Sequence, residues 1–293
     1  MNDAIDLAVL GGSGFYTMPG LQEIDEVRID TPFGAPSDAI RVGTLEGRRI
    51  AFLARHGRWH TLIPSEIPQR ANFWALKSLG VKRVLAVSAV GSLHEEYRPG
   101  EIVVPDQLID RTGGLRPATF FGDGIVAHAG FGDPFCAILR GELASAAGDA
   151  GITIHSGGAY VVIEGPAFGT RAESELYRSW GARVVGMTAS PEAKLAREAE
   201  LCYAILAAVT DYDSWHIGHD AVTATTVFEV LAGNVRTSQD VVRQLALRPF
   251  QTDCACGNTL DSALVTAPER ITAGVRERLH PILARRLGLE SGT

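Results

Sequence analysis

The run YAILAAVTD, residues 203–211, decides the fold class. Its residues are apolar without interruption from Ala204 to Val209, so apolar and polar positions do not alternate. A strand of this kind is buried on both faces, as in a parallel or mixed sheet between two layers of helices. The runs RVLAVSAVGS (83–92) and ARVVGMT (182–188) have the same character. The sequence therefore predicts an α/β protein with a central mixed β-sheet flanked by α-helices.

Apolar runs of strand length alternate with longer segments of helical period along the chain. No linker and no internal repeat interrupts this order, which predicts a single domain over residues 1–293 with an irregular segment at 251–267 and a helix at the C-terminus. Ser65 is the expected N-cap of the first helix, which ends at Gly80. Strands are expected at 6–10, 49–54, 83–92, 100–109, 158–166, 182–188 and 203–211, and further helices at 135–151, 170–181, 191–201, near 224–247 and near 268–287.

Composition and charge exclude several classes of function. Of the 293 residues, 46% are hydrophobic and 21% are charged, as in an ordinary globular protein, and the formal net charge is −7. A protein that binds nucleic acid usually has a basic stripe, which is missing from this sequence, so we expect no nucleic-acid partner. We also expect no signal peptide and no membrane contact, and hence a cytoplasmic protein.

Polar residues follow several of the predicted strands, where ligands bind in folds of this class. Hydroxyl groups of Ser13, Ser88 and Thr188, the guanidinium of Arg55 and the imidazole of His56 together suit a bound phosphate. Each of these motifs also has a purely structural explanation, as a tight turn or a surface loop. The glycine loop at 11–14 does not continue into the dinucleotide fingerprint because position 17 is Thr, which disfavours a nicotinamide-dependent oxidoreductase.

Asp211 and Asp213 flank Tyr212 at the end of the apolar run 203–211. They could belong to a surface turn. Alternatively, the two carboxyl groups exchange hydrogen bonds with a heterocycle, because a buried carboxylate is costly unless a partner satisfies it. At this point both explanations remain open.

Eight segments of the chain, in order, resemble the 5′-methylthioadenosine phosphorylases of the trimeric purine nucleoside phosphorylase superfamily. The similarity runs from about residue 6 to residue 250. The segments are GGSGFY (11–16), DTPFGAPSD (30–38), ARHGRWHTLIPSEIPQRANFWALK (54–77), SAVGSL (88–93), PGEIVVPDQLIDRT (99–112), IEGPAFGTRAES (163–174), GMTASPEAKLAREAELCYA (186–204) and TDYDSW (210–215).

The resemblance implies phosphorolysis of a 5′-modified adenosine, such as 5′-deoxy-5′-(methylthio)adenosine, to adenine and a 5-modified ribose 1-phosphate. It implies a homotrimer that uses inorganic phosphate as co-substrate and needs no cofactor or metal. Asp211 would act as general acid at purine N7, and His56 would bind the phosphate and take part in catalysis. The implied phosphate site is Ser13, Arg55, His56, Ser88, Ala89 and Thr188; the implied nucleoside site is Phe168, Met187, Asp211 and Asp213; and the 5′ substituent would lie near Ala224 and near His128 of a neighbouring subunit.

The sequence departs from the family pattern at the purine and at the 5′ position. The usual GPRFS motif reads GPAFG here, so Ala167 replaces an arginine and Gly169 lacks a hydroxyl near the base. Ala224 stands where a larger apolar residue is common, which could widen the 5′ pocket. The alternatives are a phosphorylase of 6-oxopurine nucleosides, a hydrolase that uses water and a nucleoside-binding protein without catalysis. The two aspartates argue against the first, and the phosphate-directed residues argue against the other two.

The four cysteines predict no metal site. Cys254 and Cys256 form a C-x-C pair, and no second pair completes a zinc motif in the sequence. Cys136 and Cys202 are expected to be small buried apolar residues.

Overall fold

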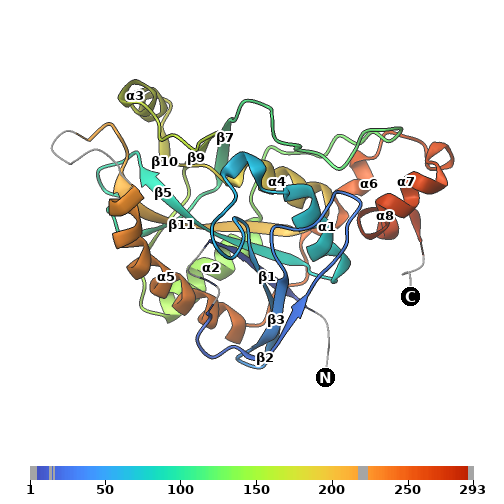
Figure 1. Cartoon of the computed structure of the whole chain (residues 1–293), viewed down its shortest axis with the longest axis horizontal. Coiled ribbons are helices and arrows are strands. Elements are labelled where there is room, and N and C mark those ends of the chain that lie inside the picture. The colour runs from blue at the N-terminus through green and yellow to red at the C-terminus, as the bar shows by residue number, and fades with distance from the viewer. Residues whose placement is uncertain (1–4, 13–14, 16, 217–223, 290–293) are drawn as a thin grey trace.

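A computed structural model describes residues 5–12, 15, 17–216 and 224–289 of the chain (Figure 1). The strands are β1 (Leu7–Gly11), β2 (Gln22–Val27), β3 (Ile40–Leu45), β4 (Arg48–Ala54), β5 (Arg83–Ser92), β6 (Ile102–Val104), β7 (Gln107–Arg111), β8 (Ile154–Ser156), β9 (Ala159–Ile163), β10 (Ala182–Gly186) and β11 (Cys202–Tyr212).

The α-helices are α1 (Gln69–Ser78), α2 (Ala137–Asp149), α3 (Arg171–Ser179), α4 (Ala189–Glu198), α5 (Ala224–Leu247), α6 (Leu260–Ala263), α7 (Ala273–Arg278) and α8 (His280–Leu287). Three short 3₁₀ helices are η1 (Pro64–Glu66), η2 (Ala255–Asn258) and η3 (Pro268–Arg270).

These strands form one mixed sheet that branches at β5, as the continuous apolar runs predict. Strands β2, β3, β4, β1, β5, β10, β9 and β7 follow one another across the sheet, and β11 pairs with β5 and β6. Strand β5 runs parallel to both β1 and β11, whereas its last residues pair with β10 in the antiparallel direction. The carboxyl ends of β1, β4 and β11 therefore meet around the second half of β5.

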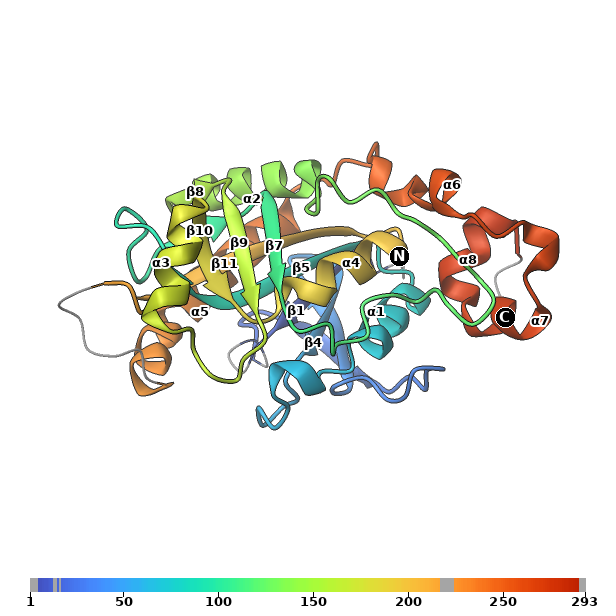
Figure 2. The same cartoon turned by 90° about the horizontal axis from the view of Figure 1, so that it is seen from above.

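Helices cover both faces of the sheet (Figures 1 and 2). One apolar core lies between the sheet and helices α1, α4 and α8 and includes Phe73 and Leu195. The other lies between the sheet and helices α2 and α5 and includes Leu139 and Val242. The C-terminal helices α6–α8 lie at one end of the molecule, and α3 lies at the other (Figure 1). No helix in the described part of the chain has both the length and the apolar character that a membrane crossing requires.

Several details differ from the sequence-based expectations, and strands β3 and β8 were not predicted. Helix α1 begins at Gln69, after the separate turn η1, so Ser65 is not its N-cap. The predicted strand 100–109 is two strands, β6 and β7, and the predicted helix 268–287 is divided among η3, α7 and α8. Strand β2 was missed because its sequence, QEIDEV, is polar and mostly exposed at the edge of the sheet, where charged residues discourage pairing with other chains.

Candidate active site

One cavity of about 370 Å³ opens at the carboxyl ends of β4, β10 and β11 and beside the second half of β5. This volume is within the range of small-molecule sites. The expected site residues that line it are Arg55, His56, Ser88, Ala89, Phe168, Met187, Thr188, Asp211 and Asp213.

The other expected residues do not line the cavity in this chain. Gly169 follows the lining residue Phe168 but is not itself part of the wall. His128 is exposed in the segment before α2, where its backbone N–H donates to the carbonyl of Ala263. Ser13 and the side chain of Ala224 lie outside the described part of the chain.

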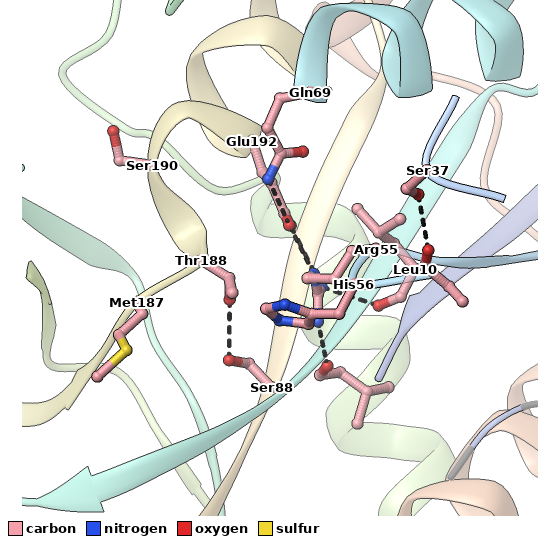
Figure 3. Close-up of polar contacts among 12 residues, drawn as sticks. Leu10, Ser37, Arg55, His56, Gln69, Ser88, Met187, Thr188, Ser190 and Glu192 are labelled. Atoms are coloured by element: carbon pink, nitrogen blue, oxygen red, sulfur yellow. Dashed lines mark hydrogen bonds and ion pairs between the residues drawn. The ribbon is translucent and has the colours of Figure 1, made fainter. Parts of the chain in front are cut away.

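Arg55 is held rigidly at the end of β4 (Figure 3). Its side chain is 2% exposed, and its Nε donates to Glu192 Oε1 at 2.7 Å. Nη1 donates to the carbonyl of Val87 at 2.7 Å, and Nη2 donates to the carbonyl of Leu10 at 2.9 Å and to Glu192 Oε2 at 3.4 Å. A guanidinium has five N–H donors, so these contacts leave a single N–H, on Nη1. Arg55 can therefore offer an anion its charge and one hydrogen bond, but not a two-pronged fork.

His56 carries no charge in the free protein at neutral pH. Burial and the nearby guanidinium of Arg55 together lower the pKa of this imidazole to about 4, against the opposing effect of the Leu62 carbonyl. Nδ1 lies 2.8 Å from that carbonyl oxygen, which can only accept, so the proton of the neutral ring is assigned to Nδ1. Nε2 then carries a lone pair and can accept a hydrogen bond from a protonated oxygen of a ligand.

Ser88 and Thr188 place two hydroxyl groups side by side between β5 and the end of β10 (Figure 3). Their oxygens are 3.0 Å apart, and the hydroxyl of Tyr160 lies 3.3 Å from that of Ser88. Burial raises the pKa of Tyr160, which keeps its hydroxyl protonated. Hydroxyl groups can donate as well as accept, so Ser88 and Thr188, which line the cavity, can turn protons toward an anion, with the buried Tyr160 hydroxyl behind Ser88.

Asp211 has the protonation behaviour of a general acid. Burial, together with the negative charge of Asp213, raises the pKa of its carboxyl group to about 6. A hydrogen bond of 2.7 Å from the hydroxyl of Thr210 to Oδ2 acts in the opposite direction. The carboxyl group is thus partly protonated near neutral pH and can give a proton to a ligand atom.

Asp213 is buried beside Asp211 and has an unused acceptor. Its side chain is 5% exposed, and its Oδ2 has no hydrogen-bond partner among the described residues. Gly91 on β5 makes room for both carboxyl groups: a Cβ at this position would lie 3.1 Å from Asp213 Cβ and 3.2 Å from Asp211 Oδ1. Burial raises the pKa of this carboxyl group, against the smaller effect of the nearby hydroxyl of Ser174, which lowers it. Oδ2 can accept a hydrogen bond from a donor on a ligand, which would satisfy a buried polar atom that otherwise has no partner in the described part of the chain.

Phe168 and Met187 supply the apolar part of the cavity. Phe168 is 44% exposed despite its size, so one side of its ring is free to cover a ligand. Met187 packs against Gly165, where a Cβ would come within 2.5 Å of its Sδ. Arg116 fixes this corner, because it donates to the carbonyl of Met187 at 2.6 Å and to Glu164 Oε1 at 2.8 Å.

Glu192, Arg116 and Gly91 take part in the site, although no sequence motif predicted a role for them. Glu192 is fully buried and also accepts a hydrogen bond of 2.7 Å from the hydroxyl of Tyr203. In the sequence it is one carboxylate in a helix that contains several charged residues, and nothing there distinguishes it. Only the fold brings it to Arg55, 137 positions away in the chain.

The fold brings a second pair of cysteines to the C-x-C pair, although no second pair completes a zinc motif in the sequence. Cys136 and Cys202 are buried, as expected, but they provide the pair that is missing from the local sequence. The four sulfur atoms all lie within 4.8 Å of one another. None of the four cysteines lines the cavity.

The chain is similar over most of its length to proteins of one family. Residues 6–246 match the family described as the Phosphorylase superfamily. The chain belongs to this superfamily. A protein of Chloroflexus aurantiacus named S-methyl-5′-thioadenosine phosphorylase is 56% identical over 280 residues, which are 95% of this chain and 97% of that protein. A protein of the same name from Geobacter sulfurreducens is 50% identical over 94% of this chain and 97% of its own length.

Solved structures of the superfamily have the same fold. A methylthioadenosine phosphorylase from an Antarctic soil metagenomic library superposes with a TM-score of 0.90 at 46% identity, over 96% of this chain and all of that one. A mutant phosphorylase of Schistosoma mansoni in complex with methylthioadenosine superposes with a TM-score of 0.79 at 35% identity, over 83% of this chain and 90% of that one. These matches confirm the expected fold class.

Proposed function

We propose that this chain catalyses the phosphorolysis of 5′-deoxy-5′-(methylthio)adenosine to adenine and 5-methylthioribose 1-phosphate. One observation carries the proposal: the same cavity holds a group of anion-binding side chains and a pair of buried carboxyl groups. Phosphorolysis needs both, because an anion attacks the sugar while the departing base must receive a proton. The names of the relatives in Chloroflexus and Geobacter support the same reaction.

The phosphate would lie against Arg55, His56, Ser88 and Thr188, with Ser13 and the backbone N–H of Ala89 completing the site. Arg55 supplies positive charge and one N–H. Nε2 of the neutral His56 accepts a hydrogen bond from a protonated phosphate oxygen, and the hydroxyl groups of Ser88 and Thr188 donate hydrogen bonds to other phosphate oxygens. Phosphate bound in this way is both the nucleophile at C1′ and the counter-charge to the positive sugar of the transition state.

The purine would stack on Phe168, with N7 at Asp211 and the 6-amino group at Asp213. When the bond from C1′ to N9 breaks, the electron pair goes to the base, and Asp211 transfers its proton to N7. The free Oδ2 of Asp213 accepts from an amino group but is repelled by the O6 of a 6-oxopurine, which is also an acceptor. This difference favours adenine nucleosides over inosine and guanosine.

The sugar would lie on Met187, with its 5′ group toward Ala224. His128 is not among the residues that line the cavity of its own chain, which is consistent with a contribution to a neighbouring subunit in a homotrimer. The reaction needs inorganic phosphate as co-substrate and no further cofactor. The proposed location is the cytoplasm.

Base selectivity tests the roles of the two aspartates. Initial rates are measured with methylthioadenosine, 5′-deoxyadenosine and inosine at saturating phosphate. We expect turnover of both 6-aminopurine nucleosides and a kcat/KM for inosine that is lower by at least about 10²-fold, since a mismatched buried polar contact is strongly discriminating. Preference for inosine would establish the alternative, a 6-oxopurine nucleoside phosphorylase. Equal turnover of methylthioadenosine and 5′-deoxyadenosine would indicate that Ala224 leaves the 5′ pocket wide.

A further inference from the structure

The four cysteines of the chain come together at one point of the fold, remote from the cavity. Cys136, Cys202 and Cys256 are buried, and Cys254 is half-buried. Each sulfur lies within 4.8 Å of the other three, and the sulfur atoms of Cys136 and Cys254 are 3.4 Å apart. The four residues derive from three separate segments, so their meeting is a property of the tertiary structure.

Each segment is fixed by backbone contacts beside its cysteine. Cys136 is the N-cap of α2, and its backbone N–H donates to the carbonyl of Tyr203, the residue after Cys202. Cys202 begins β11, and its N–H donates to the carbonyl of Lys82. Cys254 and Cys256 lie at the start of η2. The sulfur atoms thus project from a rigid framework and not from mobile loops.

The sulfur positions suit a tetrahedral metal ion. In a Cys₄ zinc site each Zn–S bond is about 2.3 Å, so the sulfur atoms are about 3.8 Å apart along the edges of the tetrahedron. The sulfur atoms of Cys136 and Cys254 are 3.4 Å apart and no two of the four are more than 4.8 Å apart, so the cluster has the size of such a site. Changes of roughly 1 Å or less in side-chain positions would therefore produce the ideal geometry.

The surroundings provide positive charge and N–H donors for thiolates. The N–H of Leu139, in the first turn of α2, lies 3.4 Å from the sulfur of Cys136. Arg83 is paired in register with Cys202 across β5 and β11, and its buried guanidinium donates to the carbonyl of Gln251 at 2.5 Å. It packs on the ring of Phe250 at 4.3 Å and makes no ion pair with any described carboxylate. A buried cation without a carboxylate suits an anionic centre nearby, whereas two neutral disulfides would not compensate its charge.

We propose that Cys136, Cys202, Cys254 and Cys256 form a tetrathiolate site for Zn²⁺. Binding converts four thiols and one Zn²⁺ into a complex of net charge −2 and releases up to four protons to solvent. With all four positions occupied by protein, no position is open for water or substrate, so the role is structural. The metal would join η2 and the 251–267 segment to α2 and to the beginning of β11.

The site is independent of the proposed reaction. Cys202 is at the start of β11 and Asp211 is near its end, and nine residues of extended strand separate their Cα atoms by roughly 30 Å. Loss of the metal is therefore expected to loosen the C-terminal segment without changing any group that lines the cavity.

Metal analysis of the purified chain tests the proposal. The protein is prepared without chelator, dialysed, and analysed for zinc by mass spectrometry, and its X-ray absorption is measured at the zinc edge. The expected result is one zinc per chain, with four sulfur neighbours at about 2.3 Å. A mercurial reagent should release this zinc in step with the titration of the four thiols.

Two variants give the test a matched control. Cys254→Ser alters the least buried ligand, and its zinc content should fall at least tenfold. Asp253→Asn changes the neighbouring exposed residue and should keep one zinc per chain. If the serine variant does not fold, the zinc content and sulfur coordination of the unaltered protein still show whether the four cysteines bind zinc. Zinc below one tenth per chain after incubation with one equivalent of Zn²⁺, or two disulfides in the alkylated, denatured protein, would overturn the proposal.

Discussion

Replacement of Glu192 by glutamine tests how the fold prepares Arg55. Glu192 is fully buried and Arg55 is 2% exposed, so neither charge is solvated by water. In Glu192→Gln, one amide oxygen can still accept from Nε of Arg55. The amide NH₂ would then occupy the place of Oε2, which now accepts from the hydroxyl of Tyr203 at 2.7 Å and from Nη2 of Arg55 at 3.4 Å. The hydroxyl of Tyr203 can rotate and accept a hydrogen bond from this NH₂ group, but the guanidinium of Arg55 has only donors and cannot accept one.

The expected loss of stability is large because a buried cation remains without its partner. Removal of one member of a buried ion pair costs about 3–5 kcal/mol of the free energy of unfolding. For proteins of about 150–250 residues, a loss of about 1 kcal/mol in the free energy of unfolding lowers Tm by 2–4 °C. Applied to this chain, the loss lowers Tm by roughly 6–20 °C. A displaced guanidinium also no longer meets the phosphate, and an error of about 1 Å in position can reduce kcat/KM for phosphate by about 10²-fold.

The assay combines urea unfolding with initial rates at varied phosphate. Glu26→Gln is the matched control, because Glu26 is exposed and pairs at 2.8 Å with the half-buried Arg58, which follows Arg55 in the same loop. An exposed pair contributes at most about 1 kcal/mol, so this control should remain close to the unaltered protein. If Glu192→Gln is as stable and as active as Glu26→Gln, the assigned role of the buried pair is wrong.

Three further predictions concern the carboxyl pair and His56. Asp211→Asn should lower kcat/KM by about 10²–10⁴-fold and abolish the loss of activity above about pH 6, because the pKa of Asp211 is raised to about 6; a pH profile identical to that of the unaltered protein would contradict the general-acid role. Gly91→Ala should raise KM for the nucleoside several-fold and leave KM for phosphate unchanged, because the new methyl group would lie 3.1 Å from Asp213 Cβ; Gly141→Ala, with no heavy atom within 4 Å of the new Cβ, is the control. The pKa of His56 is about 4 in the native protein and 6.5 in the unfolded chain, so only the unfolded chain gains this proton as pH falls from 6.5 to 4. Stability should be fully present above pH 6.5 and decline below it, and His56→Asn should make the decline shallower in urea unfolding across this range.

The long buried strands of the fold could be predicted because their sequences carry a direct signal, whereas the shorter buried strand β3, whose apolar run is broken by Arg41, Gly43 and Thr44, was missed. Strand β5 coincides with the run 83–92, and β11 extends the run 203–211 by one residue at each end. An uninterrupted apolar segment of this length has few alternatives in a globular protein. Strand β2 has no such signal, since an exposed edge strand is selected for its charges and not for burial.

The cavity residues could be predicted where several short motifs follow neighbouring strands. Residues 55–56, 88–89, 187–188 and 211–213 meet in the structure because each lies toward the carboxyl end of a strand in one sheet. Glu192 and the cysteine cluster could not be predicted in this way. Arg55 is 137 positions from Glu192 and Cys136 is 118 positions from Cys254, and only the packing of α2 and α4 on the sheet brings these residues together.

The protonation state of His56 is another property that depends on the tertiary structure. In the sequence it belongs to a run of basic residues, which suggests a positively charged loop. In the structure, burial lowers its pKa and the carbonyl of Leu62 fixes the position of its proton. Its proposed role changes accordingly, from attracting the phosphate by charge to accepting a hydrogen bond from a protonated phosphate oxygen.

The phosphate dependence of adenine release from methylthioadenosine, with identification of the sugar product, decides between phosphate and water as the nucleophile. We predict no release in phosphate-free buffer. With phosphate, each molecule of adenine should be accompanied by one molecule of methylthioribose 1-phosphate, and Asp213→Asn should reduce the rate. Release of adenine together with free methylthioribose in the absence of phosphate would contradict the proposed reaction, because water would then be the nucleophile and the anion site at Arg55 and His56 would have no part in it.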